Sequence, residues 1–269
     1  MSTLKFKPIF DTLQASSTVA EAAVFKHGAR AMSDAASDTK EFRFHCFVGI
    51  FLSPMSHDKI THEAVMSLKA LPSGLTPQSI VDMDLDVLKS KLTKVNHHKS
   101  KAENLKTACA RLLSEFDGDV PSEVPVLQTF KGIGPKIALL VSEVCWNKSV
   151  GIVVDTHVHR ICNKIGWVKT KDPEGTRKAM EALVDSSEHV LVNECLVALG
   201  QTICKAAKPD CANCPIREMV DCAFGKTGTP SSISSKKETP AKTPANPEAK
   251  PKAPKRRAPK RQHVSVSGD

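Results

Sequence analysis

The sequence contains no tyrosine, and aromatic residues make up only 4% of its 269 residues. It also lacks an apolar stretch long enough for the hydrophobic region of a signal peptide or for a transmembrane helix, which argues against a membrane partner. Acidic residues near the start, among them Asp11, Glu21 and Asp34, disfavour a transit peptide. Hydrophobic residues still make up 41% of the chain, which is enough for a substantial core. We therefore expect a folded protein without a membrane-spanning segment.

Net charge is also missing from most of the chain. Residues 1–225 carry 27 basic and 26 acidic side chains, whereas residues 226–269 carry a net charge of +8 and seven prolines. The first segment therefore cannot be identified as a nucleic-acid binder from its charge. The second has almost no apolar residues, so we expect a disordered basic tail. Its residues 254–261 are typical of a nuclear-import signal or an electrostatic DNA tether, and a solvated tail without a partner is the alternative.

Period-two alternation, the pattern of a β-strand, is absent beyond the short segment 152–154. Helical patterns recur instead, and the segments that join them carry Gly, Pro, Asn and Asp, which stop helices. The predicted helices are residues 41–52, 60–71, 84–92, 99–116, 124–130, 135–144, 156–165, 173–183 and 189–202. The length suits up to two compact units and a tail. The predicted fold class is all-α.

Four cysteines follow the last predicted helix, with the spacing C-x6-C-x2-C-x7-C: Cys204, Cys211, Cys214 and Cys222. Thiolates this close in the chain form a ligand set for a soft metal centre. Two disulfides would need an oxidising compartment, of which the sequence gives no sign, and four unrelated core thiols are the other alternative. Zinc usually takes two C-x2-C pairs and only one is present, so the spacing favours an iron–sulfur centre over zinc.

The remaining five cysteines lie in apolar or helical contexts, and we expect them to be buried like small hydrophobic side chains. They are Cys46, Cys109, Cys145, Cys162 and Cys195. No function is assigned to them.

Residues 127–141 contain two apolar helical segments joined by Gly132, Ile133 and Gly134. Glycines allow unusual torsions and bring backbone amides close to a ligand. Amides at the start of the second helix can bind a DNA phosphate without contacting a base. These three residues are therefore candidate DNA contacts, and an ordinary helix connection is the alternative. Lys136 follows at the N-terminal end of the second helix, and an acidic residue, Asp155, lies further along the chain.

These blocks resemble the endonuclease III family of DNA glycosylase/AP lyases, within the helix–hairpin–helix superfamily. The resemblance rests on residues 132–138, on residues 154–160 and on the four-cysteine loop, and it spans roughly residues 40–224. It implies a [4Fe–4S] cluster bound by the four cysteines of the loop, with zinc as the alternative. The fourth, Cys222, lies two residues further along the chain than the family spacing places it.

The resemblance identifies Lys136 as the catalytic lysine and Asp155 as the catalytic aspartate. A carboxylate stabilises the positive charge that develops on the sugar as the base–sugar bond breaks. An unprotonated amine can attack C1′, form a Schiff base and cut the strand by β-elimination, and partial desolvation would favour that neutral form. Monofunctional relatives lack a lysine here. A surface lysine that contacts phosphate is the alternative role for Lys136.

The sequence departs from the family where damaged DNA is opened. Met55 stands where the family usually has a glutamine, and residues 96–98 (Asn-His-His) stand where it has a second, apolar wedge. We expect Met55 and His97 to contact the DNA. His45 and His57 form no metal set with His97 and His98 by spacing, and all four histidines are expected on the surface or facing DNA.

The sequence as a whole predicts a bifunctional DNA glycosylase/AP lyase of base excision repair. Its expected partner is double-stranded DNA with oxidised pyrimidines or abasic sites, and it is expected to be a monomer in the nucleus and secondarily the mitochondrion. The alternative is a catalytically weak or differently specific lesion-binding member of the same fold. The predicted division is a segment 1–37 that packs with a cluster domain 147–225, a helical barrel 38–146 and the tail 226–269.

Overall fold

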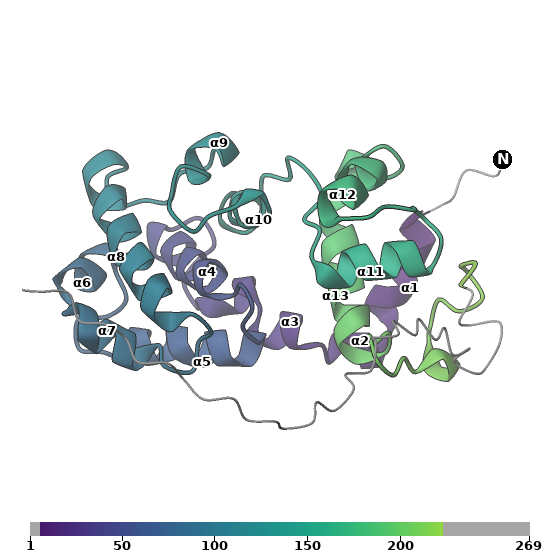
Figure 1. The fold of residues 1–269 in the computed structure, drawn as a ribbon, viewed down its shortest axis with the longest axis horizontal. Helices are drawn as coiled ribbons and strands as arrows, with labels where there is room; N and C mark the ends of the chain where they lie inside the picture. Colours follow the sequence, from purple (N-terminus) through teal and green to yellow (C-terminus); the bar gives the residue numbers. More distant parts are fainter. Residues whose placement is uncertain (1–5, 223–269) are drawn as a thin grey trace, which may run out of the picture. The chain divides into compact units, whose positions relative to one another are not determined.

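All regular secondary structure in the computed structural model is helical within residues 6–222, the part of the chain that it describes (Figure 1). The α-helices are α1 Phe6–Ala15, α2 Ser17–Ala20, α3 Ala23–His27, α4 Lys40–Leu52, α5 Asp58–Lys69, α6 Pro77–Asp82, α7 Leu85–Lys91, α8 His98–Glu115, α9 Val124–Leu127, α10 Pro135–Trp146, α11 Thr156–Lys164, α12 Pro173–Glu181 and α13 His189–Thr202. Short 3-10 helices lie at Ala29–Met32 (η1), Ser186–Glu188 (η2) and Cys211–Asn213 (η3). None of the helices in this range is both long and apolar enough to cross a membrane.

The predicted fold class is confirmed for the described residues, and every predicted helix is present. The predicted helix at 124–130 is the most shortened, because α9 ends at Leu127 and the amides of Thr129 and Phe130 donate to carbonyls three residues back. Four α-helices of the described residues were not predicted: α1, α2, α3 and α6. The tail 226–269, with its proposed import signal, lies outside the described residues.

Helix α4 is the centre of the first hydrophobic cluster. Its residues from Phe42 to Leu52 are all buried, and they pack with apolar side chains of α5, α6, α7, α8 and α10. Figure 1 shows these helices gathered in one group around α4. The cluster includes Met32, so apolar packing continues to the N-terminal side of residue 38.

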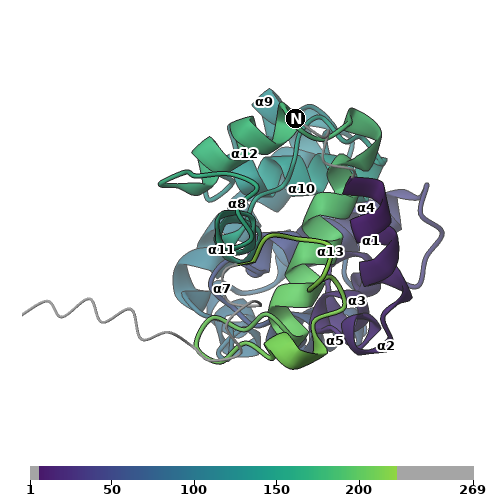
Figure 2. The same cartoon turned by 90° about the vertical axis from the view of Figure 1, so that its right-hand side faces the viewer.

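A second hydrophobic cluster joins the start of the chain to residues 152–216. Helix α1 lies beside α13, as both views show (Figures 1 and 2), and its buried residues recur at helical spacing: Phe6, Ile9, Phe10 and Leu13. Trp167 packs edge-on against Phe6, with ring centroids 5.0 Å apart. Boundaries at residues 37 and 146 stay a prediction.

The five cysteines outside the C-terminal loop are all buried, as predicted. The prediction of a surface position is wrong for His45, which is only 3% exposed because α4 is buried on every side. Its Nε2 lies 3.1 Å from the carbonyl of Leu75 and its Nδ1 lies 3.0 Å from Ser33 Oγ. A carbonyl can only accept, so Nε2 carries the proton and the ring is a neutral part of the core. Burial lowers the His45 pKa.

Arg43, also on α4, forms the most enclosed ion pair of the first cluster. Its Nε lies 2.9 Å from Asp119 Oδ1 and its Nη2 lies 2.5 Å from Oδ2, while the guanidinium stacks on Trp146, 4.2 Å from the ring centroid. Burial raises the pKa of Asp119, but hydrogen bonds from Arg43 and from the Val120 amide outweigh it, so the pKa lies below its usual range. The pair ties α4 to the loop that follows α8.

Asp119→Asn should lower the free energy of unfolding by about 1.5–3 kcal/mol at neutral pH, because it removes a charge-assisted pair from a half-buried site. A depressed pKa in the folded state contributes stability above the unfolded-state value of 3.8, and that contribution is lost as the pH falls through the folded value. Urea unfolding at pH 7 and at about pH 3 should therefore show a smaller difference between wild type and variant at the lower pH. An equal difference at both values would contradict the ionic role.

Candidate active-site cleft and cysteine cavity

The turn between α9 and α10 depends on Gly132. Its φ of 94° lies in the left-handed region, and a Cβ there would sit 3.4 Å from Asn104 Nδ2 and 3.5 Å from Phe51 Cζ. Those distances are ordinary van der Waals contacts, so the left-handed φ is the reason that glycine is required here. Gly134 has a φ of −90°, and no atom lies within 4 Å of where its Cβ would be. The special torsions expected at both glycines therefore occur only at Gly132.

The hairpin leaves amides for a ligand at the start of α10. The Ile133 amide already donates to the carbonyl of Phe130 at 3.0 Å, and its side chain is buried. The first amides of a helix have no intrahelical partner and attract anions. Lys136 and Ile137 supply such amides, because Pro135 is the first residue of α10 and has no N–H. Ile133 thus shapes the turn, and the role of the three turn residues in DNA binding stays a prediction.

Lys136 is the second residue of α10, and it is exposed. The sequence predicted a partly desolvated amine at this position. The protein alone does not provide that desolvation, because the side chain projects from the first turn of the helix into an open cleft. Water around the amine would have to be displaced by a bound molecule.

Asp155 is the N-cap of α11. Its Oδ1 accepts hydrogen bonds from the amides of His157, at 2.8 Å, and Val158, at 2.9 Å. An N-cap of this kind satisfies two helix amides and fixes the direction of the carboxylate. Within residues 6–222 no hydrogen bond to the other oxygen, Oδ2, is present, so that oxygen can face a ligand.

Lys136 and Asp155 line the same cleft, which has a volume of about 820 Å³. Met55 lies on its wall, with a side chain that is 76% exposed and a φ of 60°. His97 is exposed and also has a left-handed backbone, but it is not among the residues that line the cleft. The structure therefore brings together three of the predicted site residues, the catalytic pair and Met55.

Sequence reasoning missed several polar side chains of this cleft. Asn193, from α13, lines it and donates to the carbonyl of Val153 at 2.7 Å, which holds the segment before Asp155. His157 also lines the cleft, and its ring packs against Gly200, where a Cβ would lie 2.4 Å from Nδ1. His157 lies inside the block 154–160 and could have been found there. Asn193 lies in an otherwise apolar helix, where a single amide gives little signal.

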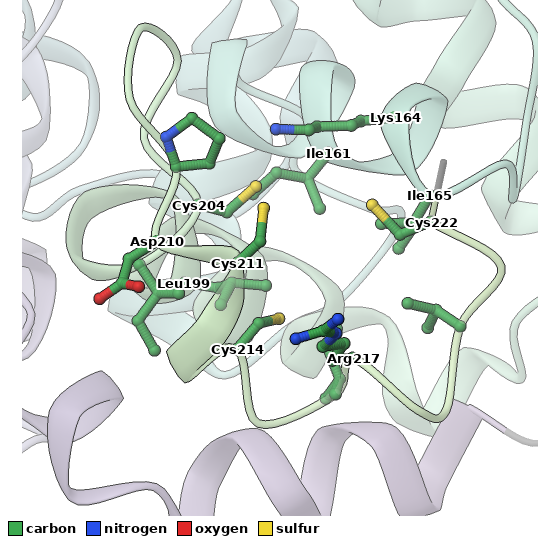
Figure 3. Close-up of a pocket in the computed structure, with 14 residues that line it drawn as sticks. Ile161, Lys164, Ile165, Leu199, Cys204, Asp210, Cys211, Cys214, Arg217 and Cys222 are labelled. Carbon is green, nitrogen blue, oxygen red and sulfur yellow. The ribbon is translucent and has the colours of Figure 1, made fainter. Parts of the chain in front are cut away.

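The four cysteines of the C-terminal loop line one cavity, and Figure 3 shows their side chains directed toward a shared space. All four are half-buried. Cys204 follows α13, while Cys211 begins the short helix η3 and Cys214 ends it. Cys222, the ligand with the unusual spacing, lines the same cavity.

The walls of this cavity are mostly apolar, with two basic side chains and one acidic side chain, Asp210. Apolar side chains such as Ile161 and Leu199 lie beside the basic side chains of Lys164 and Arg217 (Figure 3). Arg160 Nη1 lies 3.7 Å from Cys204 Sγ, and its Nη2 lies 3.4 Å from His157 Nδ1. Positive charge of this kind suits an anionic centre held by thiolates.

The donor set, four thiols that line one cavity, suits a metal centre held by cysteine. A zinc ion holds each cysteine sulfur about 2.3 Å away, which forces four sulfurs to crowd around one point. Among the residues described, no three His, Cys, Asp or Glu side chains converge in that way. In a [4Fe–4S] cluster each cysteine binds a different iron, so the sulfurs stand further apart around a larger body.

Comparisons with known proteins place these features in a family. A family model described as "HhH-GPD superfamily base excision DNA repair protein" matches residues 48–186. "Endonuclease III homolog 2, chloroplastic" of Arabidopsis thaliana is 42% identical over 211 residues, which are 74% of this chain and 54% of that protein. The "Endonuclease III homolog" of Encephalitozoon cuniculi is 41% identical over 189 residues, 66% of this chain and 78% of its own length. The chain thus spans about half the length of the plant relative.

A solved structure agrees in fold. "Structure of a non-covalent Endonuclease III-DNA Complex" matches with a TM-score of 0.68 over 84% of this chain and 97% of that one, at 21% identity. An identity this low supports the fold alone. The sequence matches carry the assignment further: the chain belongs to the endonuclease III family, within the HhH-GPD superfamily of base excision DNA repair proteins.

Proposed function

We propose that the protein is a DNA glycosylase of base excision repair that also cuts the DNA strand as an AP lyase. The observation that carries the proposal is that Lys136 and Asp155 line one cleft, each at the N-terminal end of a helix. The proposed substrate is double-stranded DNA with an oxidised pyrimidine or an abasic site, flipped out of the duplex into the cleft. Family membership supports the glycosylase, and the lysine supports the lyase.

Asp155 would act on the bond between base and sugar. As that bond breaks, its electron pair leaves with the base and positive charge develops on the sugar ring. A carboxylate held by two amides cannot turn away, so its charge is preorganised for this transition state. The unbonded Oδ2 is the oxygen that would face the sugar.

Lys136 would supply the nucleophile. Once the base has left C1′, or the C1′ hydroxyl of an abasic site has left as water, Nζ bonds to that carbon and gives up a proton. The bond between C1′ and the ring oxygen then breaks, which opens the sugar and gives a Schiff base. Loss of a proton from C2′ next breaks the bond between C3′ and its phosphate oxygen, which cuts the strand. Since Lys136 is exposed in the free protein, we infer that the bound DNA displaces water from the amine and so favours its neutral form.

We also propose that Cys204, Cys211, Cys214 and Cys222 bind a [4Fe–4S] cluster, with zinc as the alternative. The cluster would supply a structural tie, because the segment 204–222 has few apolar residues of its own in the second hydrophobic cluster. The protein would work as a monomer, in the nucleus and secondarily in the mitochondrion. The nuclear location rests on residues 254–261 of the sequence.

Lys136→Ala should abolish the covalent adduct that borohydride traps on abasic duplex DNA, because it removes the amine that forms the Schiff base. Binding to that DNA should remain. Lys148→Ala is the matched control, since Lys148 lies just beyond the other end of α10 and pairs with Glu123 at 3.1 Å. Trapping by the Lys136 variant would identify another amine as the nucleophile. Binding without trapping by the wild type would instead favour the catalytically weak, lesion-binding member of the fold.

Asp155→Asn should slow release of a damaged base by about 100-fold or more, since the charge is lost while the amide oxygen can still cap α11. Cleavage of a preformed abasic site should suffer less, because no base–sugar bond remains to be broken. The measurement is single-turnover base release followed by alkali treatment, with far-UV circular dichroism as the test of folding. Equal losses on both substrates would assign Asp155 a role in binding DNA.

Purified protein should be yellow-brown and contain about four iron atoms per chain, as a [4Fe–4S] cluster requires. Cys214→Ser should lose the colour and yield poorly soluble protein, because the loop would have no centre to fold around. Cys195→Ser is the control, since Cys195 is a buried thiol in α13 outside the cavity. A colourless wild type with one zinc ion would contradict the cluster.

A further inference from the structure

Lys101 is a buried cation beneath the loop that carries Met55. It lies in α8 and is only 9% exposed. Its ammonium lies 2.8 Å from the carbonyl oxygen of Leu52, 2.6 Å from that of Pro54 and 3.4 Å from Ser56 Oγ. An ammonium has three N–H groups, so these three acceptors satisfy it. Within residues 6–222, Lys101 forms no ion pair with a carboxylate.

The position of this ammonium follows from the end of α4. That helix ends at Leu52, and its last carbonyls have no partner within the helix and form its negative end. A cation there is stabilised by the helix and by charge-assisted hydrogen bonds. Burial nevertheless lowers the Lys101 pKa to about 8, so desolvation of the charge is substantial. The hydrogen bonds fix the course of the backbone from residue 52 to residue 56.

Asn96 also binds the same loop. Its Nδ2 donates to the carbonyl of Met55, and its backbone amide donates to Ser56 Oγ at 3.1 Å. Lys101 and Asn96 thus join two separate segments, the loop 53–57 and the turn 95–98, into one unit. These are the two places where the sequence departs from the family in its wedge residues.

Both segments hold a backbone conformation that ordinary residues disfavour. Met55 has a φ of 60° and His97 a φ of 58°. Such a conformation persists only where the surroundings impose it. The hydrogen bonds from Lys101 and Asn96 supply that constraint next to Met55, whose side chain is left 76% exposed on the cleft wall.

We propose that Lys101 is a positioning residue for lesion opening: together with Asn96, it holds the loop 53–57 in one conformation and so presents Met55 as a preformed wedge. This inference rests on the proposed function. A wedge that is ordered before binding loses little conformational freedom when it enters the duplex. Filling the space left by a flipped nucleotide then offsets part of the unstacking free energy.

Lys106 provides a matched control within the same helix. Its ammonium also lies among backbone carbonyls at a helix end, those of Ile80 and Val81 in the last turn of α6 and of Met83 just after it. Lys106 does not line the cleft, and it makes no contact with the Met55 loop. Lys101→Met and Lys106→Met therefore remove the same kind of interaction, and only the first touches the proposed wedge.

The test measures kcat/KM of the full-length variants on two duplexes, one with a single dihydrouracil and one with a preformed abasic site. Lys101→Met should lower kcat/KM on dihydrouracil by about ten- to a hundredfold, because small displacements of the reacting groups cause losses of this size. Cleavage of the abasic site should change little. Fluorescence of a 2-aminopurine placed opposite the lesion should show that the Met55 side chain enters the duplex less often. Lys106→Met should lower thermal stability without changing the ratio between the two substrates.

A double-mutant cycle decides whether Lys101 acts through the wedge. In a Met55→Ala background, Lys101→Met should cause little further loss, because the side chain that it positions is already gone. An undiminished further loss, or the same substrate ratio for both lysine variants, would overturn the inference. If Lys101→Met does not fold, Asn96→Ala should show the same substrate bias, and its absence would also overturn it. Failure of the wild type to form a trapped adduct would refute the proposed lyase instead.

Discussion

The burial of α4 on every side is the constraint on which the cleft depends. Phe51, near its C-terminal end, packs against the hairpin, with its Cζ 3.5 Å from where a Cβ of residue 132 would lie. Arg43, near its N-terminal end, ties the helix to Asp119. The carbonyl of its last residue, Leu52, binds the ammonium of Lys101. Hairpin, ion pair and Met55 loop therefore all take their positions from one helix that cannot shift without opening the core.

The cleft is electrostatically organised by local dipoles, because the segment 1–225 has almost no net charge. The N-terminal ends of α10 and α11 both open on it, and each carries partial positive charge that favours an anion. Asp155 already occupies one such end, where the amides of His157 and Val158 orient its carboxylate. DNA would thus meet one free positive end near the reacting groups, that of α10, which has no side-chain cap. The net charge of residues 1–225 would add little long-range attraction.

Much of the fold could be predicted from the sequence, because its helices end at Gly, Pro, Asn and Asp and have clear apolar patterns. Helix α1 also has a regular pattern, but it becomes stable only against α13, a partner distant in the chain. His45 was misplaced for a similar reason, since nothing local distinguishes a buried histidine in α4 from an exposed one. The exposure of Lys136 could not be predicted either, as it depends on how wide the cleft is. The role of Lys101 could not be read from the sequence, because its partners are two backbone carbonyls and a serine hydroxyl from a distant loop.

The scarcity of aromatic residues has a practical consequence. The chain has two tryptophans and no tyrosine. Trp146 stacks on Arg43 in the first hydrophobic cluster, and Trp167 packs against Phe6 in the second. Each hydrophobic cluster therefore contains its own tryptophan. If one tryptophan is replaced with phenylalanine, the remaining tryptophan emission reports on the other cluster alone. Unfolding around each tryptophan can then be followed separately by fluorescence, because no tyrosine emission overlaps with that of tryptophan.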